Sequence, residues 1–180
     1  MPMQELEVRI GLLRLLLADI QGKQAQLLDM EKQYRVQLTR VVEFVVYREG
    51  NLDNALNLMA EVQGKLDEVL KTSTHLSMVA GKAVIELEVL NLTKRVAEAR
   101  SQLGELEQRR RTLSEKLESV VGGEGTEERY TLEPVQVDTI RSINDEVEIV
   151  VEEIQRLNTL ITEASERAAQ TVQSRLGNQS

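Results

Sequence analysis

The sequence contains no cysteine, which excludes disulfide bonds and thiolate metal sites. Aromatic side chains make up 2% of the chain, and tryptophan is absent, although 41% of the residues are hydrophobic. Enzyme cores draw much of their volume from aromatic rings, whereas a helical bundle can be filled by Leu, Val, Ile and Ala. Proline is also scarce, with two residues in a chain of 180. The composition therefore favours an all-α protein.

Long hydrophobic runs are missing as well. The longest apolar stretch, 10–20, is interrupted by Arg14 and Asp19, so it is too short and too charged to span a bilayer. Residues 1–7 are acidic and lack the basic segment that opens a secretory signal. We therefore expect a cytoplasmic protein without a membrane partner.

Basic residues are fewer than acidic ones, 22 against 30. The net charge is −8, and the segment 118–166 carries 13 acidic side chains against three basic ones. A nucleic-acid-binding protein would present a basic face to the phosphate backbone. The charge distribution therefore predicts no nucleic-acid partner.

Against these absences stands a regular apolar repeat near the end of the chain. Its members recur at alternating spacings of three and four residues: Ile140, Ile143, Val147, Val150, Ile154, Leu157, Ile161, Ala164 and Ala168. This spacing is typical of a coiled-coil seam, in which one stripe of a helix packs against a neighbouring helix. The repeat predicts a third helix over 137–176.

Two further helices are predicted before it. The first covers 3–48 and ends in a basic last turn at Arg48 and a terminating glycine at Gly50, after which Asn51 or Asp53 can cap the next helix. The second covers 52–121, with a possible kink at 71–76, where threonine and serine accumulate. Each helix has an apolar seam. The seam of the first is Leu6, Ile10, Leu13, Leu17, Ile20, Leu27, Met30, Tyr34, Leu38, Val41 and Val45, and that of the second begins with Leu52, Ala55, Met59, Val62, Leu66 and Val69 and continues through Ala80 and Ala83. The glycine-rich and then acidic segment 122–136 is the predicted linker. All three helices are expected to form a single domain, 1–180.

These helices predict an all-α fold, an elongated antiparallel three-helix coiled coil built as a staggered rod. The long hairpin would pair the first helix with about 52–97 of the second, and the C-terminal helix would pair with about 80–120. Around 80–97 the second helix should therefore need two apolar faces. The sequence supplies them, with Leu87 and Leu90 in one phase and Val89 and Leu92 in the other.

Charge supports a register for the C-terminal pair. In this arrangement Arg109, Arg110 and Arg111 lie opposite residues near 147, within an acidic run that extends to Glu153. Arg110 falls on the apolar seam, where a charged residue can specify register at some cost in stability. We therefore expect an ion-pair ladder between the three arginines and the carboxylates of 146–153.

Catalytic motifs are not recognisable. The sole histidine, His75, has no cysteine partner and no metal-ligand spacing around it, so a solvent-facing residue is expected there. Gly81 and Lys82 lack the earlier glycine and the following Ser or Thr of a phosphate-binding loop. Adjacent acidic pairs such as Glu152 and Glu153 point about 100° apart on a helix and do not converge on one ion. No catalytic, cofactor-binding or metal-binding residue is predicted.

Two segments are more apolar than one helix partner requires. At the hairpin tip, apolar side chains of 41–47 spread over most of the helix circumference. They form either an exposed patch, which marks a contact with a partner, a membrane or another copy, or a thicker core that the turn 52–59 covers. In 12–17 the excess is ascribed mainly to core packing at the three-stranded centre. The predicted partner-binding residues are Val42, Phe44, Val46, Tyr47, Leu12 and Leu16.

The sequence thus leads to two functional hypotheses. The first is a non-enzymatic coiled-coil structural or assembly protein, a homo-oligomer or a subunit or scaffold in a larger complex, which binds protein partners through helix–helix contacts. The alternative is a small acidic helical chaperone or adaptor that holds an amphipathic segment of an export or assembly client.

Overall fold

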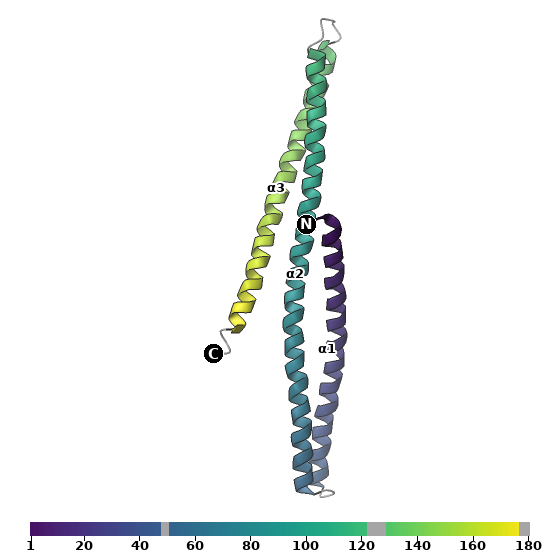
Figure 1. The fold of residues 1–180 in the computed structure, drawn as a ribbon, viewed down its shortest axis with the longest axis vertical. Helices are drawn as coiled ribbons and strands as arrows, with labels where there is room; N and C mark the ends of the chain where they lie inside the picture. The colour runs from purple at the N-terminus through teal and green to yellow at the C-terminus, as the bar shows by residue number, and fades with distance from the viewer. Residues whose placement is uncertain (48–50, 122–128, 177–180) are drawn as a thin grey trace. The chain divides into compact units, whose positions relative to one another are not determined.

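The computed structural model describes the backbone of residues 1–47, 51–121 and 129–176, and the side chains of 1–47, 51–116 and 137–170. Across these residues the chain forms three α-helices and no strand (Figure 1). They are α1 (Met3–Val46), α2 (Leu52–Val121) and α3 (Arg129–Leu176). Helix α1 packs against α2, and α2 packs against α3. The predicted all-α, three-helix class is confirmed.

The starts of α1 and α2 follow the capping chemistry of their sequences. The main-chain carbonyl of Pro2 accepts hydrogen bonds from the amides of Glu5 and Leu6, at 3.0 and 3.2 Å. Asn51 caps α2, since its side-chain oxygen accepts a hydrogen bond of 2.9 Å from the amide of Asp53. This bond satisfies one of the amides that a helix start leaves without an internal partner. The negative charge of Asp53 also suits the first turn of the helix.

Helix α2 continues through 71–76 without a break. There the Thr74 hydroxyl donates to the main-chain carbonyl of Leu70 at 3.0 Å, so the hydroxyl is satisfied within the helix instead of competing with it. The predicted continuous helix over 52–121 is confirmed.

Helix α3 begins earlier than the sequence predicts, at Arg129 and not near 137. Pro134 falls inside the predicted linker, and proline lacks the amide hydrogen that a helix interior uses. In the structure Pro134 lies in the second turn of α3, where it removes a single main-chain hydrogen bond close to the helix start. The predicted linker 122–136 is therefore wrong over 129–136, and 122–128 lies outside the described residues. Helix α1 ends at Val46, and the predicted stop at 48–50 also lies outside them.

The chain divides into two compact units. One consists of residues 1–7 and 88–180, and the other of residues 8–87. The first unit holds the start of α1, the second part of α2 and all of α3, whereas the second unit is a hairpin of α1 and α2. The single domain expected from the sequence stays a prediction.

In the 8–87 unit, α1 and α2 run antiparallel and bury one stripe each (Figure 1). A hydrogen bond of 3.4 Å from the Gln24 side chain to the Ser77 hydroxyl joins the two stripes partway along the hairpin. The most buried side chains of this unit recur at helical spacing, and they are Ile10, Ile20, Ala55, Val62, Leu66, Val69 and Ala83. Each of them belongs to the apolar seams that the sequence predicts.

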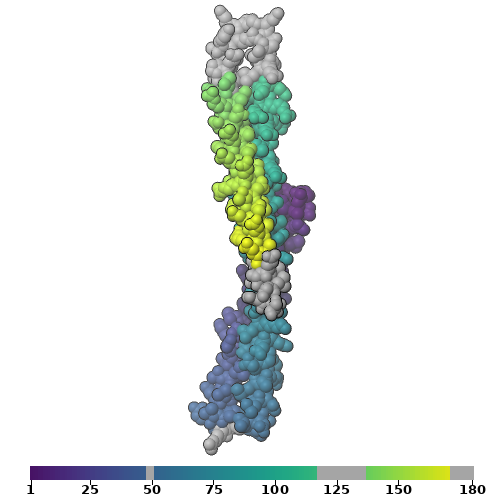
Figure 2. All heavy atoms as spheres, turned by 90° about the vertical axis from the view of Figure 1, so that its left-hand side faces the viewer, coloured from purple at the N-terminus to yellow at the C-terminus, as the bar shows by residue number. Residues whose placement is uncertain are grey.

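In the other unit, the seam of α3 packs on α2 (Figure 2). All nine predicted seam residues of α3 are buried or half-buried. The heptad position held by Ile143, Val150, Leu157 and Ala164 is the deeply buried one, and Leu157 is 1% exposed. On α2 it meets Leu92 and Val96 in one cluster and Leu106 in a second. The predicted partner of the α3 seam is confirmed.

The same unit contains a short three-helix section. At adjacent positions of α2, the ammonium of Lys94 lies 2.8 Å from the Glu7 carboxylate of α1, and the guanidinium of Arg95 lies 2.9 Å from the Glu153 carboxylate of α3. Leu90 and Leu92 are both buried although they lie about 200° apart on the helix. This part of α2 therefore uses two apolar faces, as the sequence predicts.

Candidate functional site: the apolar hairpin tip

The tip of the hairpin, where α1 ends and α2 begins, exposes a cluster of large apolar side chains. From α1 these include Tyr47, which is 75% exposed, and Val46, which is 68% exposed. We call the whole set the tip surface: Val42, Phe44, Val46 and Tyr47 from α1, and Leu52, Leu56 and Leu58 from α2. Exposed patches of this kind commonly mark an interaction site.

The tip surface covers two flanks of the hairpin. At about 100° per residue, Phe44 falls on one side of the α1 seam, while Val42 and Val46 fall on the other. On α2 the same spacing separates Leu58 from Leu56. Neither helix can turn both flanks toward its single partner in the hairpin, and this geometry leaves the side chains in solvent.

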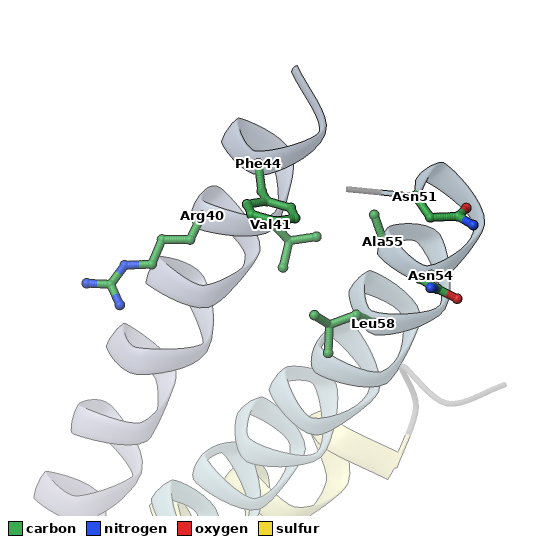
Figure 3. A pocket seen from close by; sticks show the side chains of 7 residues that line it. All are labelled: Arg40, Val41, Phe44, Asn51, Asn54, Ala55 and Leu58. Atoms are coloured by element: carbon green, nitrogen blue, oxygen red, sulfur yellow. The ribbon is translucent and has the colours of Figure 1, made fainter. Parts of the chain in front are cut away.

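One flank forms a groove between the two helices, with a volume of about 460 Å³. Its apolar lining comes from Val41 and Phe44 of α1 and from Ala55 and Leu58 of α2. Figure 3 shows these four side chains directed into the space between the helices, with Arg40 directed away from it. The polar lining residues are Arg40, Asn51 and Asn54. In Figure 3 the Asn51 and Asn54 amides also point away from this space, so the groove is mainly apolar.

The structure confirms that the tip residues identified from the sequence are exposed. Val42, Phe44, Val46 and Tyr47 all lie in solvent, so the alternative, a core covered by the first turns of α2, is wrong. The contribution of α2 was not predicted: Leu52 is assigned to the α2 seam by the sequence but is exposed. Leu56 and Leu58 flank that seam, and the spacing of Leu52, Leu56 and Met59 was the available signal for a second face.

The prediction that 12–17 belongs mainly to the core is wrong at several positions. Leu12 is 61% exposed and Leu15 is 66% exposed, and Leu16 is exposed as well. Leu13 and Leu17, which lie on the α1 seam, are half-buried. The cause is the narrow sector that one neighbouring helix covers. Leu12 and Leu16, both predicted partner-binding residues, therefore form a second exposed apolar region.

The predicted arginine ladder is also wrong. Within the described residues, no ion pair links Arg109, Arg110 or Arg111 to the carboxylates of 146–153. Arg110 instead donates a hydrogen bond of 3.3 Å to the side-chain oxygen of Asn144. Among the described residues, the ion pairs that join α2 to α3 include Arg95 with Glu153 and Glu88 with Arg167, both at 2.9 Å.

Polar chemistry in the described residues is confined to the surface. No polar or charged side chain there is buried, and no group of three His, Asp or Glu residues is placed to hold a metal ion. His75 is exposed. On α2 the Lys65 ammonium donates to the Glu61 carboxylate at 2.8 Å. This hydrogen bond, with the attraction of the two charges, lowers the pKa of Glu61 and raises the pKa of Lys65.

No helix in the described part of the chain contains a stretch long and apolar enough to cross a membrane. Comparison with known proteins gives no relative from which a role can be transferred. The chain matches no protein-family model, no curated protein and no solved structure. Its function must therefore be inferred from its own surfaces.

Proposed function

We propose that the protein is a non-enzymatic, cytoplasmic coiled-coil assembly protein that acts as a subunit or scaffold of a larger complex. In this proposal the packed helices hold the tip surface in place, and the tip surface binds a helical segment of another protein. The observation that carries the proposal is the concentration of exposed apolar side chains on both flanks of the hairpin tip.

The chemistry of the groove suits a helical partner. An amphipathic helix places apolar anchors three and four residues apart into a groove of this kind. The Phe44 ring and the Leu58 side chain, which point into the groove, supply apolar contact area for these anchors. An aromatic side chain at the centre of an interface often carries a large share of the binding energy.

The test compares two doubly substituted chains in affinity purification from the native host. In the first, Phe44→Ser and Val46→Ser remove apolar surface from the two flanks of the tip. In the second, Leu28→Ser and Val36→Ser make the same kind of change at similarly exposed positions elsewhere on α1. We expect the tip variant to lose partners that the wild type and the control variant retain.

Circular dichroism keeps the result interpretable. All four substituted side chains are exposed, so both variants should keep the helicity of the wild type. If the folded tip variant recovers the same partners as the control variant, the tip surface is not the binding site and the proposal fails.

The groove also favours a second candidate, a helical chaperone or adaptor for an amphipathic segment of an export or assembly client. The two candidates differ in what happens after assembly. A structural subunit remains in the mature complex at a fixed stoichiometry, whereas a chaperone is released when its client is incorporated. Quantitative mass spectrometry of the isolated mature complex separates them, because a chaperone would be absent from it.

A further inference from the structure

A second exposed apolar surface lies on α1, away from the tip. Its members are Val8, Leu12, Leu15 and Leu16, and we call this set the α1 stripe. At about 100° per residue they fall within one sector roughly 100° wide, which points away from the seam residues Ile10, Leu13 and Leu17. Helix α1 thus has two apolar faces, of which α2 covers one.

We propose that the α1 stripe is a homodimer interface, in which α1 of a second copy packs antiparallel about residue 14. A two-fold axis there brings Leu12 of each copy opposite Leu16 of the other. A symmetric dimer uses the same patch on both subunits, so the patch must be complementary to itself. The charges that border the α1 stripe meet this condition.

The charges of Arg9 and Asp19 indicate that the partner of the α1 stripe is α1 of a second copy. Both are exposed, and in the described part of the chain neither takes part in an ion pair. Antiparallel pairing about residue 14 places Arg9 of each copy opposite Asp19 of the other. Parallel pairing would set Arg9 against Arg9 and Asp19 against Asp19, which is repulsive.

The sequence of α1 continues the same pattern outward. One helical turn before Arg9 stands Glu5, and one turn after Asp19 stands Lys23. On the side of the helix that carries the α1 stripe the signs are therefore negative, positive, negative and positive, and they invert about residue 14; Glu7 and Arg14 fall on the other side. A basic face, which would suit an anionic membrane surface, is not what this pattern provides. An unrelated helical partner would not require the inversion either.

Charge reversal gives a test that a chance apolar contact would not pass. Arg9→Glu sets two acids against each other at both ends of the dimer, and Asp19→Arg sets two arginines against each other. Each single variant should dissociate about tenfold more readily than the wild type in sedimentation velocity. The double variant Arg9→Glu with Asp19→Arg restores opposite charges and should recover the wild-type dimer.

A mixture of the Arg9→Glu and Asp19→Arg variants tests the pairing of positions 9 and 19 most directly. In a mixed dimer, Glu at position 9 meets Arg at position 19, and Arg9 meets Asp19, so both ends become attractive. We expect the mixture to dimerise although neither variant does so alone at the same concentration. A wild-type chain that stays monomeric at about 100 µM overturns the proposal. A dimer that dissociates no more readily after the charge reversals than the wild type also overturns the proposal.

Apolar substitutions complete the experiment and separate this proposal from the tip proposal. Leu12→Ser with Leu15→Ser should give a helical monomer, whereas the control Leu28→Ser should remain a dimer. Val46→Ser should also leave the dimer unchanged, because it lies in the tip surface. A monomeric wild type whose flotation with anionic vesicles is abolished by Leu12→Ser would assign the α1 stripe to a membrane surface and refute the dimer.

Discussion

Replacing Leu157 by alanine tests whether α3 is held on α2 by its apolar seam. Leu157 is 1% exposed and packs with Leu92 and Val96. Leu→Ala in a packed core costs about 2–5 kcal/mol, as the lost transfer free energy adds to the cavity left behind. Two helices can shift toward each other more easily than a deep core can collapse, so we expect about 2–3 kcal/mol.

Urea unfolding followed by circular dichroism at 222 nm measures this loss of stability. The slope of the free energy of unfolding against urea concentration should be about the same in the wild type and in Leu157→Ala. The matched control is Ile149→Ala on the same helix. Ile149 is 66% exposed, and the alanine that replaces it favours a helix, so its effect should stay within about 0.5 kcal/mol.

Equal unfolding midpoints for Leu157→Ala and the wild type would refute the reasoning. That outcome would mean that the 140–168 seam does not face α2. The ion pairs assigned between α2 and α3 would then be wrong as well. A large effect of Ile149→Ala would show instead that the opposite face of α3 is the packed one.

Three further outcomes follow from the same geometry. A double-mutant cycle on Arg95 and Glu153, which are both partly exposed, should give a coupling below about 1 kcal/mol in urea unfolding. Lys65→Ala should return the pKa of Glu61 toward its ordinary value in a carbon-13 NMR titration. Because the folded protein lowers this pKa, the pair stabilises the fold at pH values above the ordinary carboxyl pKa, and this stabilisation is lost as the pH falls through the lowered pKa. Gly64→Ala should stabilise the protein by roughly 0.5–1 kcal/mol in thermal unfolding, because the added methyl group meets nothing within 4 Å and glycine is unfavourable inside a helix.

The fold class and the seams were predictable because they depend on period alone. A spacing of three and four residues places side chains on one helix face whatever that face meets. The seam of α3 is therefore identified residue by residue, from Ile140 to Ala168. The Asn51 cap was predictable for a similar reason, since its chemistry is local.

Register was not predictable to single residues, because the connection between two helices determines it. With the third helix starting at 137, the sequence sets Arg110 opposite residues near 147. Helix α3 in fact begins at Arg129, and Arg110 forms a hydrogen bond with Asn144. A shift of three residues moves an acidic partner out of reach, although it leaves the apolar stripe facing α2.

Exposure at the tip was predictable only in part. Counting apolar residues around α1 shows that Phe44 and Val46 cannot share one partner helix. The same count made 12–17 look like a core, because a third helix was expected to cover it. How far one helix covers another depends on packing, and here Leu12 and Leu15 remain in solvent.

Exposed apolar residues are unevenly distributed between the two units of the chain. Among the described side chains, the unit of 1–7 and 88–180 exposes three large apolar residues, Met1, Val137 and Ile149, whereas the hairpin unit 8–87 contains both the tip surface and the α1 stripe. In the former unit α2 meets α3 and the start of α1, so most of its large apolar side chains have partners within the chain. A hairpin of two helices covers one sector of each, and its remaining apolar side chains gain burial only from another molecule. The most regular repeat in the sequence therefore packs within the chain, and the less regular apolar surfaces of the hairpin are the ones that we propose as binding sites for partners.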